Sequence, residues 1–411
     1  MKRLSKCLGI MVLAVTMTCG LYPNGLNLNG NGSKAIAMGG AFVGLADDYS
    51  AIFWNPAGLT QMKETQLAFF GTDVIPKGTY QLQLPQVTID AKTANKMYPS
   101  GGIGFFKPLS SDIVVGVYAH VPSGLGAKWN GADLAALTQG AAFQWESFFG
   151  VFAFSPAIAI KLNEQFSLGA VLNIDYGMLK LKRPGLGQYD EDLKGLAVGA
   201  TFGMLFKPSD QISFGVSFKT PVKATLSGDA TMSGAGLVGL PTTDDAERKA
   251  TLPMWLGAGL CVRPTEELTI TADVQYTNWK KVKNIPVAYT NAGWKQFFEA
   301  DADLQLRWKD AVQLRFGLEY WVSSAFALRG GFYTDPIVSP IDTHSILLPE
   351  HAYNWVTFGF GYKAGNISLD VAVEYGMGKD VTVSFAEAGD GMPGTYGVKI
   401  FVPNIALTIR L

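Results

Sequence analysis

Apolar and polar residues alternate along the chain from about residue 64 onward, in stretches of about ten residues. Clear stretches lie at 211–219, 268–277, 312–320 and 367–375. In the first of them, polar or small residues alternate with Ile212, Phe214, Val216 and Phe218. Successive side chains of a strand point to opposite faces of a sheet, so a period of two predicts β-strands rather than helices.

Short polar turns and longer connections separate these stretches in strict alternation. The turns are rich in Pro, Ser, Asn and Asp, as tight turns are, and lie at 108–112, 162–165, 208–211, 264–267, 323–324 and 363–366. The longer connections cover about 76–98, 122–147, 183–193, 227–247, 283–309, 335–350 and 378–394. This pattern is typical of an outer-membrane barrel with brief periplasmic turns and long extracellular loops. We therefore predict an all-β fold, a transmembrane antiparallel β-barrel of about fourteen strands.

The charged residues of the predicted strands indicate which face meets lipid. A charge on the lipid face near the midplane costs roughly 2–4 kcal/mol. We therefore expect a lumenal position for the charges in the polar phase, which are Asp175, Asp273, Arg315, Glu319, Arg329, Asp370 and Glu374. The tyrosines near the strand ends stay in the apolar phase and suit an aromatic girdle, namely Tyr176, Tyr276, Tyr320, Tyr362 and Tyr375.

Composition supports this class of protein. The chain is 48% hydrophobic and only 16% charged, yet no internal run reaches the ~18 apolar residues of a membrane helix. A formal net charge of −1 argues against a nucleic-acid partner, which would require a basic face.

The N-terminus predicts export. Lys2, Arg3 and Lys6 precede a short apolar stretch at 8–15, which is the pattern of a cleavable signal peptide. We assign residues 1–20 to it and place the mature protein in the Gram-negative outer membrane. Lipidation at Cys19 is the alternative, although Thr16-Met17-Thr18 makes a poor lipobox.

Residues 21–62 do not alternate and are rich in Gly, Asn and Ala. They also carry Met38, Phe42 and Trp54, which favour burial. We therefore assign 21–62 to an N-terminal hatch folded into the barrel, and 63–411 to the barrel itself. A periplasmic tail is the alternative.

Several motifs of the chain resemble the FadL/TodX-type outer-membrane transporters. The most specific is the triplet Asn55, Pro56 and Ala57 after Ala46-Asp47-Asp48. Other matching motifs lie at 24–28, 37–42, 252–255, 276–279 and 308–311. The resemblance implies a plugged barrel of fourteen strands that takes up long-chain fatty acids or hydrocarbons. It also implies passive transport, without ATP, with exit through a sideways opening at the third strand.

The resemblance assigns roles to several residues. Pro122, Ser123 and Gly124 would form the lateral opening, because Pro lacks a ladder donor and Gly loosens a strand; an ordinary strand end is the alternative. Gly124 also aligns with a glycine of the ligand site. Arg183 aligns with an arginine that meets the ligand head group, which suits a carboxylate, although a solvated basic cluster would look the same.

Two further positions bear on the ligand. Asp335 aligns with an acidic residue of the tight site near the hatch, but Asp before Pro336 also forms turns. A family lysine that assists head-group binding is Leu304 here. Long-chain fatty acids are the expected ligand on the resemblance. The leucine weakens this expectation and leaves uncharged aromatic or aliphatic hydrocarbons as the alternative.

Other functions fit the sequence less well. A general porin would need an open charged lumen, whereas 21–62 predicts a plug. An enzyme is not expected, because the chain has three histidines and neither a GxSxG nor an HExxH motif. We expect no metal and no cofactor. The expected partners are a hydrophobic small molecule and outer-membrane lipids, around a monomeric barrel.

Overall fold

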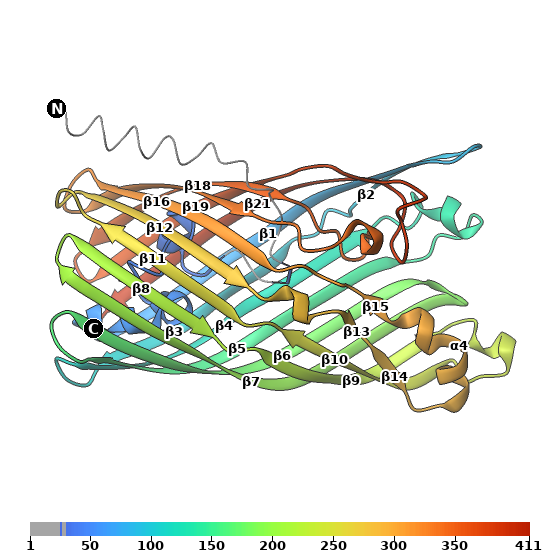
Figure 1. Cartoon of the computed structure of the whole chain (residues 1–411), viewed down its shortest axis with the longest axis horizontal. Coiled ribbons are helices and arrows are strands. Elements are labelled where there is room, and N and C mark those ends of the chain that lie inside the picture. The colour runs from blue at the N-terminus through green and yellow to red at the C-terminus, as the bar shows by residue number, and fades with distance from the viewer. Residues whose placement is uncertain (1–24, 27–29) are drawn as a thin grey trace.

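The computed structural model describes residues 25–26 and 30–411. They form a closed antiparallel barrel of fourteen strands, as predicted (Figure 1). The barrel closes where β1 (Gln66–Gln83) pairs with β21 (Gly394–Arg410). The predicted signal peptide at 1–20 and the alternative of lipidation at Cys19 lie outside the described residues.

The barrel wall is built in chain order, each strand pairing with the next. Some barrel strands consist of two consecutive pieces: β2 and β3 both pair with β1, and β8 and β9 both pair with β7. The remaining wall strands are β2 (Thr88–Lys92), β3 (Tyr98–Pro108), β4 (Ile113–Trp129), β5 (Trp145–Lys161), β6 (Phe166–Gly185), β7 (Gly187–Ser209), β8 (Ile212–Lys219), β9 (Val222–Met232), β10 (Thr243–Leu252), β11 (Trp255–Val262), β12 (Leu268–Thr277), β16 (Ala311–Trp321), β17 (Phe326–Asp335), β18 (Tyr353–Ala364), β19 (Ile367–Gly378) and β20 (Val381–Val383).

Shorter elements lie inside the barrel and beyond its wall. The N-terminal segment (residues 30–62) carries α2 (Ser33–Ala37), α3 (Ala51–Trp54) and η2 (Pro56–Gln61). The long loops carry η3 (Ala135–Thr138), η4 (Ala235–Val238), η5 (Trp279–Lys281), β13 (Asn284–Ile285), β14 (Val287–Tyr289), α4 (Ala292–Ala302), β15 (Leu304–Gln305) and η6 (Ile341–Thr343). None of the helices in the described residues is both long enough and apolar enough to cross a membrane.

The two faces of the wall differ as the alternation predicts. In β16, Leu318 and Tyr320 are exposed on the outside, whereas Gln313, Arg315 and Glu319 are buried inside. The other predicted lumenal charges are also buried, except that Asp370 is half-buried; they are Asp175, Asp273, Arg329 and Glu374. The apolar outer face is therefore the lipid-facing surface that the sequence predicted.

Several predicted connections are wrong in part. Within 76–98, β1 continues to Gln83 and β2 follows, and within 227–247 only residues 233–242 lie outside β9 and β10. The third strand does not end at Pro122: β4 continues to Trp129, because a register shift against β5 between His120 and Ser123 absorbs the proline. The long loop predicted at 183–193 is a tight hairpin, since β6 ends at Gly185 and β7 begins at Gly187. Where a strand extends beyond the membrane it needs no apolar face. The alternation of apolar and polar residues therefore stops there, although the backbone hydrogen bonds between the strands continue.

The N-terminal segment lies inside the barrel, toward the end that carries the short turns and the C-terminus (Figure 1). Its backbone is hydrogen-bonded to the inner wall. Arg315 Nη1 donates to the carbonyl of Gly39 at 3.0 Å, and the Val43 N–H donates to Asp273 Oδ2 at 2.9 Å. These bonds satisfy backbone groups of the segment that are cut off from water.

Glycines of the wall allow this close approach. A Cβ atom added to any of seven wall glycines would lie under 3.0 Å from an atom of the N-terminal segment, a distance that real Cβ atoms essentially never show. The seven belong to seven different strands and are Gly169, Gly203, Gly215, Gly259, Gly317, Gly331 and Gly359. The segment therefore packs on a surface of bare backbone.

We expect Gly331→Ala to lower the thermal unfolding temperature of the purified protein, measured by circular dichroism in detergent. The added methyl group would overlap the backbone of Met38 and Gly39, and overpacking of this kind costs about 1–3 kcal/mol. Gly330→Ala is the matched control, because its Cβ would meet a single wall atom at 3.9 Å. Equal unfolding temperatures for the two variants would contradict the packing described here.

Candidate ligand site

A cavity of about 350 Å³, which we call the main cavity, lies between the N-terminal segment, the inner wall and the loop at 336–352. Gly25 and Gly30 contribute to it from the N-terminal side. Most of its wall is apolar, formed by Tyr98, Val121, Leu125, Phe148, Val151, Phe152, Met178, Val398, Ile400 and Val402. Such an enclosed apolar surface with a few polar groups is the usual form of a small-molecule site.

The polar groups of the main cavity are mainly acidic. Asp335, Glu350 and Glu374 line it, and the described residues that line it include no Lys or Arg. Gln313 Nε2 donates to Asp335 Oδ1 at 2.6 Å, and the Tyr333 hydroxyl donates to Glu374 Oε2 at 2.9 Å. The cavity therefore lacks the cation that would pair with a ligand carboxylate.

Glu350 reaches the cavity from the loop at 336–352 and is only 2% exposed. Burial, together with the nearby Asp335 carboxyl, raises the pKa of Glu350 well above its usual range. Burial likewise lowers the pKa of His351, the next residue on the cavity wall. Both shifts favour the neutral form of the side chain, so this loop supplies polar groups without charge.

The wall beside the main cavity is loosely paired. The ladder between β3 and β4 runs from Pro108↔Val114 to Gly102↔His120. The next pair is the isolated bridge Thr93↔Trp129, with a flanking bond from the Ala94 N–H to the Lys128 carbonyl at 2.8 Å. From Thr93 to Gly102 on one side and from His120 to Trp129 on the other, the spacing is nine residues in each case. The two strands therefore keep the same register, although they are not paired between these two points.

A second cavity of about 100 Å³ lies next to α3. Its lining includes the charged residues Lys219, Arg315 and Asp175, whereas the lining of the main cavity is mostly apolar. Ser123 lines both cavities. The register shift of β4 therefore lies at the border between the two.

The structure brings some of the sequence-predicted residues together. Gly124, Ser123 and Asp335 line the main cavity, and the Gly124 N–H donates to the Leu26 carbonyl at 3.2 Å. Pro122 lines the second cavity. Arg183 is not among the residues that line either cavity: its guanidinium lies 5.2 Å from the centre of the Tyr189 ring near the long-loop end of β6.

The predicted triplet of the hatch lies against the wall, away from both cavities. Asn55 caps η2 by accepting a hydrogen bond from the Ala57 N–H at 3.3 Å. Its Nδ2 donates to the carbonyls of Val43 at 2.8 Å and Met204 at 3.0 Å. One buried amide thus joins two parts of the N-terminal segment to β7, close to Pro56.

Sequence reasoning missed most residues of the main cavity, among them the polar residues Glu350, Trp355 and Asn404. The alternation does hold a signal for Trp355, because Phe358 and Phe360 are exposed on the outer face, which places position 355 on the inner one. The same reasoning puts Asn404 inside, next to the exposed Ile405. Glu350 lies in an irregular loop, where no periodic pattern indicates direction.

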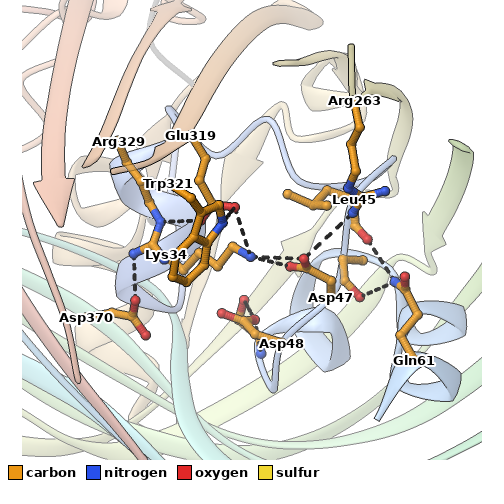
Figure 2. A network of polar contacts seen from close by, with 12 residues as sticks. Lys34, Leu45, Asp47, Asp48, Gln61, Arg263, Glu319, Trp321, Arg329 and Asp370 are labelled. Carbon is orange, nitrogen blue, oxygen red and sulfur yellow. Dashed lines mark hydrogen bonds and ion pairs between the residues drawn. The ribbon is translucent and has the colours of Figure 1, made fainter. Parts of the chain in front are cut away.

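A charge network holds the N-terminal segment at the short-turn end of the barrel (Figure 2). Lys34 Nζ lies 2.8 Å from Asp47 Oδ1 within the segment and 3.6 Å from Glu319 Oε1 on β16. Arg329 then bridges Glu319 at 2.7 Å and Asp370 at 2.6 Å. Burial alone would lower the pKa of Lys34, but the Asp47 and Glu319 carboxylates outweigh it and hold the pKa above its usual range.

The described part of the chain contains no group of three or more His, Cys, Asp or Glu side chains placed to hold a metal ion. A closed barrel with an apolar outer face, a polypeptide segment in its lumen and a mostly apolar cavity is the form of an outer-membrane channel for hydrophobic small molecules. The model of the outer membrane protein transport protein family (OMPP1/FadL/TodX) matches residues 10–408, and the chain belongs to this family.

Known relatives and structures agree with this assignment. The long-chain fatty acid transport protein of Salmonella typhi is 22% identical over 408 residues, which cover 86% of this chain and 88% of that protein. The match to the protein of the same name from Escherichia coli O6:H1 is 24% identical but covers only 46% of this chain and 44% of that protein.

Two solved structures have the same fold. A FadL homologue of Pseudomonas aeruginosa superposes with a TM-score of 0.79 at 16% identity, over 94% of this chain and 100% of that one. The toluene transporter TodX of Pseudomonas putida gives 0.75 at 18% identity, over 94% and 99%.

We expect Lys34→Met to loosen the N-terminal segment, because it leaves the Asp47 and Glu319 carboxylates without their shared cation. Removing one partner of a buried pair costs about 3–5 kcal/mol. The unfolding temperature should fall, and purified protein in a planar bilayer should conduct ions more often than wild type. Lys107→Met, at an exposed lysine near the same end of the barrel, should change neither. Wild-type conductance in Lys34→Met would show that this network does not hold the segment.

Proposed function

We propose that this outer-membrane transporter takes up uncharged hydrophobic compounds, hydrocarbons among them, by passive diffusion through the main cavity. The observation that carries this proposal is the lining of that cavity, which is apolar and acidic without a Lys or Arg among its described residues. A buried carboxylate needs a cation or several N–H donors, whereas an uncharged molecule needs neither.

The size of the cavity supports a small ligand. An apolar cavity of about 150 Å³ is large enough to bind benzene, so about 350 Å³ accommodates a substituted aromatic ring or a short alkyl chain. Each buried CH₂ stabilises a ligand by roughly 0.8 kcal/mol. A modest number of buried carbons keeps the complex weak enough to release its ligand, as conduction requires.

The ligand leaves sideways in this proposal. Residues 21–62 act as a plug, supported by the contacts between the described part of that segment and the inner wall. Val121, Ser123 and Gly124 line the main cavity where β4 parts from β3. An apolar molecule that exits between these strands enters lipid directly and avoids the charges of the second cavity.

Long-chain fatty acids are the second candidate. The relatives from Salmonella typhi and Escherichia coli are named long-chain fatty acid transport proteins. Against this candidate, Arg183 is not on the cavity wall. The sequence favoured the fatty acid, and the chemistry of the cavity favours the uncharged compound.

The protein acts as a monomer in outer-membrane lipid in this proposal. The pairing of β1 with β21 closes the described wall within a single chain, so the barrel needs no second copy to complete its sheet. The exposed apolar side chains of the outer face match a lipid environment without a protein partner.

Uptake by intact cells tests the substrate. Cells that express the protein should take up labelled toluene severalfold faster than cells with an empty vector, and should show no gain for labelled oleate. Arg183→Ala should leave toluene uptake unchanged, because Arg183 is remote from the cavity lining. Oleate uptake that is lost in Arg183→Ala would instead establish the fatty-acid candidate.

Stapling the wall tests the route. Pro99 and Ser123 both line the main cavity and lie opposite each other in the register shared by β3 and β4. A short reducible cross-linker between Pro99→Cys and Ser123→Cys should abolish toluene uptake, and reduction should restore it. Each single variant treated with the same reagent is the control. Full uptake by the cross-linked protein would place the exit elsewhere.

A further inference from the structure

The main cavity has a polar end that a plain hydrocarbon would leave unsatisfied. Five side-chain atoms of its lining residues are buried without a hydrogen-bond partner in the described structure: Thr72 Oγ1, Ser100 Oγ, Glu350 Oε2, Trp355 Nε1 and Asn404 Oδ1. The residues Glu350, Trp355 and Asn404 are 2%, 1% and 3% exposed. Each unpaired buried polar atom costs about 1–3 kcal/mol, so five of them around one cavity point to a ligand that pairs with them.

The polar residues of this end are contiguous. The Trp355 ring stacks on Tyr333 with the ring centres 5.5 Å apart, and lies at the same distance from Tyr353. The Tyr333 hydroxyl donates to Glu374, which lines the cavity together with Asn404. One patch of β17, β18, β19 and β21 thus carries the polar end of the cavity.

Glu350 joins this patch from the loop above it. Its Oε2 oxygen is buried without a hydrogen-bond partner in the described structure. Tyr353, at the start of β18, lines the cavity beside it. The loop at 336–352 therefore closes the polar end and adds a further polar group to it.

The unpaired atoms require a particular ligand chemistry. An indole N–H can only donate a hydrogen bond, and an amide oxygen can only accept one. A ligand group that pairs with both Trp355 and Asn404 must therefore accept and donate. A hydroxyl group does both, whereas a carboxylate only accepts and an ammonium only donates.

We infer that the main cavity recognises hydrophobic compounds that end in a hydroxyl group, such as phenols and alcohols. The hydroxyl accepts a hydrogen bond from Trp355 Nε1 and donates one to an oxygen of the polar end, and the hydrocarbon part lies against the apolar wall around Phe148 and Val151. This inference rests on the proposed function and narrows its substrate class.

The order of two affinities, for toluene and for 4-methylphenol, distinguishes this site from a plain apolar pocket. Toluene and 4-methylphenol share the same ring and methyl group and differ by one hydroxyl. An apolar pocket would bind toluene more tightly, because burial of an unpaired hydroxyl costs free energy. A site that pairs the hydroxyl reverses this order.

The experiment is a titration of the purified full-length protein with toluene, 4-methylphenol and 4-methylbenzoate, followed by calorimetry. We expect 4-methylphenol to bind about tenfold more tightly than toluene, the ratio that one net hydrogen bond supports. Trp355→Phe keeps an aromatic ring and removes the donor, so it should abolish this preference by weakening 4-methylphenol binding about tenfold more than toluene binding. Trp294→Phe is the matched control, because that buried indole donates to the Pro241 carbonyl outside the cavity and its loss should leave the preference intact.

Each other outcome overturns a defined claim. A phenol-to-toluene affinity ratio of one or less in the wild type overturns the inference and leaves the proposed function standing. Equal loss of both ligands in Trp355→Phe overturns it too, since the ring and not the donor would then matter. Tightest binding of 4-methylbenzoate would favour a carboxylate ligand and overturn the inference together with the proposed substrate class. Absence of binding by all three would overturn the proposed function itself.

Discussion

Backbone packed against backbone determines what the lumen of this barrel can transmit. Seven strands present glycine where the N-terminal segment meets the wall, and any side chain there would overlap the segment. The hydrogen bonds from Arg315 to Gly39 and from Val43 to Asp273 then fix the segment at that distance. Because the wall comes this close, the lumen holds polypeptide at this level where a general porin would hold water. A molecule that enters from the long-loop end must therefore stop beside the segment or leave through the wall.

The distribution of charge follows from this packing. The wall must carry its ionised groups on the inside, since lipid excludes them from the outside. Next to the segment these groups pair with one another, as Glu319 does with Arg329 and Lys34, or with the segment's backbone. The main cavity lies beyond that network, where the wall turns apolar around Phe148 and Val151. An apolar ligand thus has a mostly apolar surface to bind, outside the network of Lys34, Glu319 and Arg329.

The sequence predicted the barrel well because lipid imposes a strict rule on it. Every membrane-facing position must be apolar, so the period of two and the inward charges such as Asp273 and Glu374 could be read directly. The same rule does not apply outside the membrane, which is why the sequence predicted a long loop where the structure has a hairpin at Gly185–Gly187.

The residues around the cavity were predictable to different degrees for the same reason. Trp355 and Asn404 lie on regular strands and obey the alternation, whereas Glu350 depends on how a loop folds inward, and no local pattern determines that. Family resemblance brought Gly124 and Asp335 to the cavity but left Arg183 outside it.

The proposed route makes binding and exit depend on the same strand. Pro122 removes a donor from β4 just where its register against β5 shifts, and the ladder to β3 stops at His120. The residues that follow, Ser123 and Gly124, line the main cavity and also form the parted edge of the wall. In the proposed route, a ligand bound there already touches the strand beside which it would leave, so no large movement of the N-terminal segment would be needed. The packing of the segment and the weak ladder between β3 and β4 are then complementary: the first would block the direct path, and the second would supply the sideways exit that we propose.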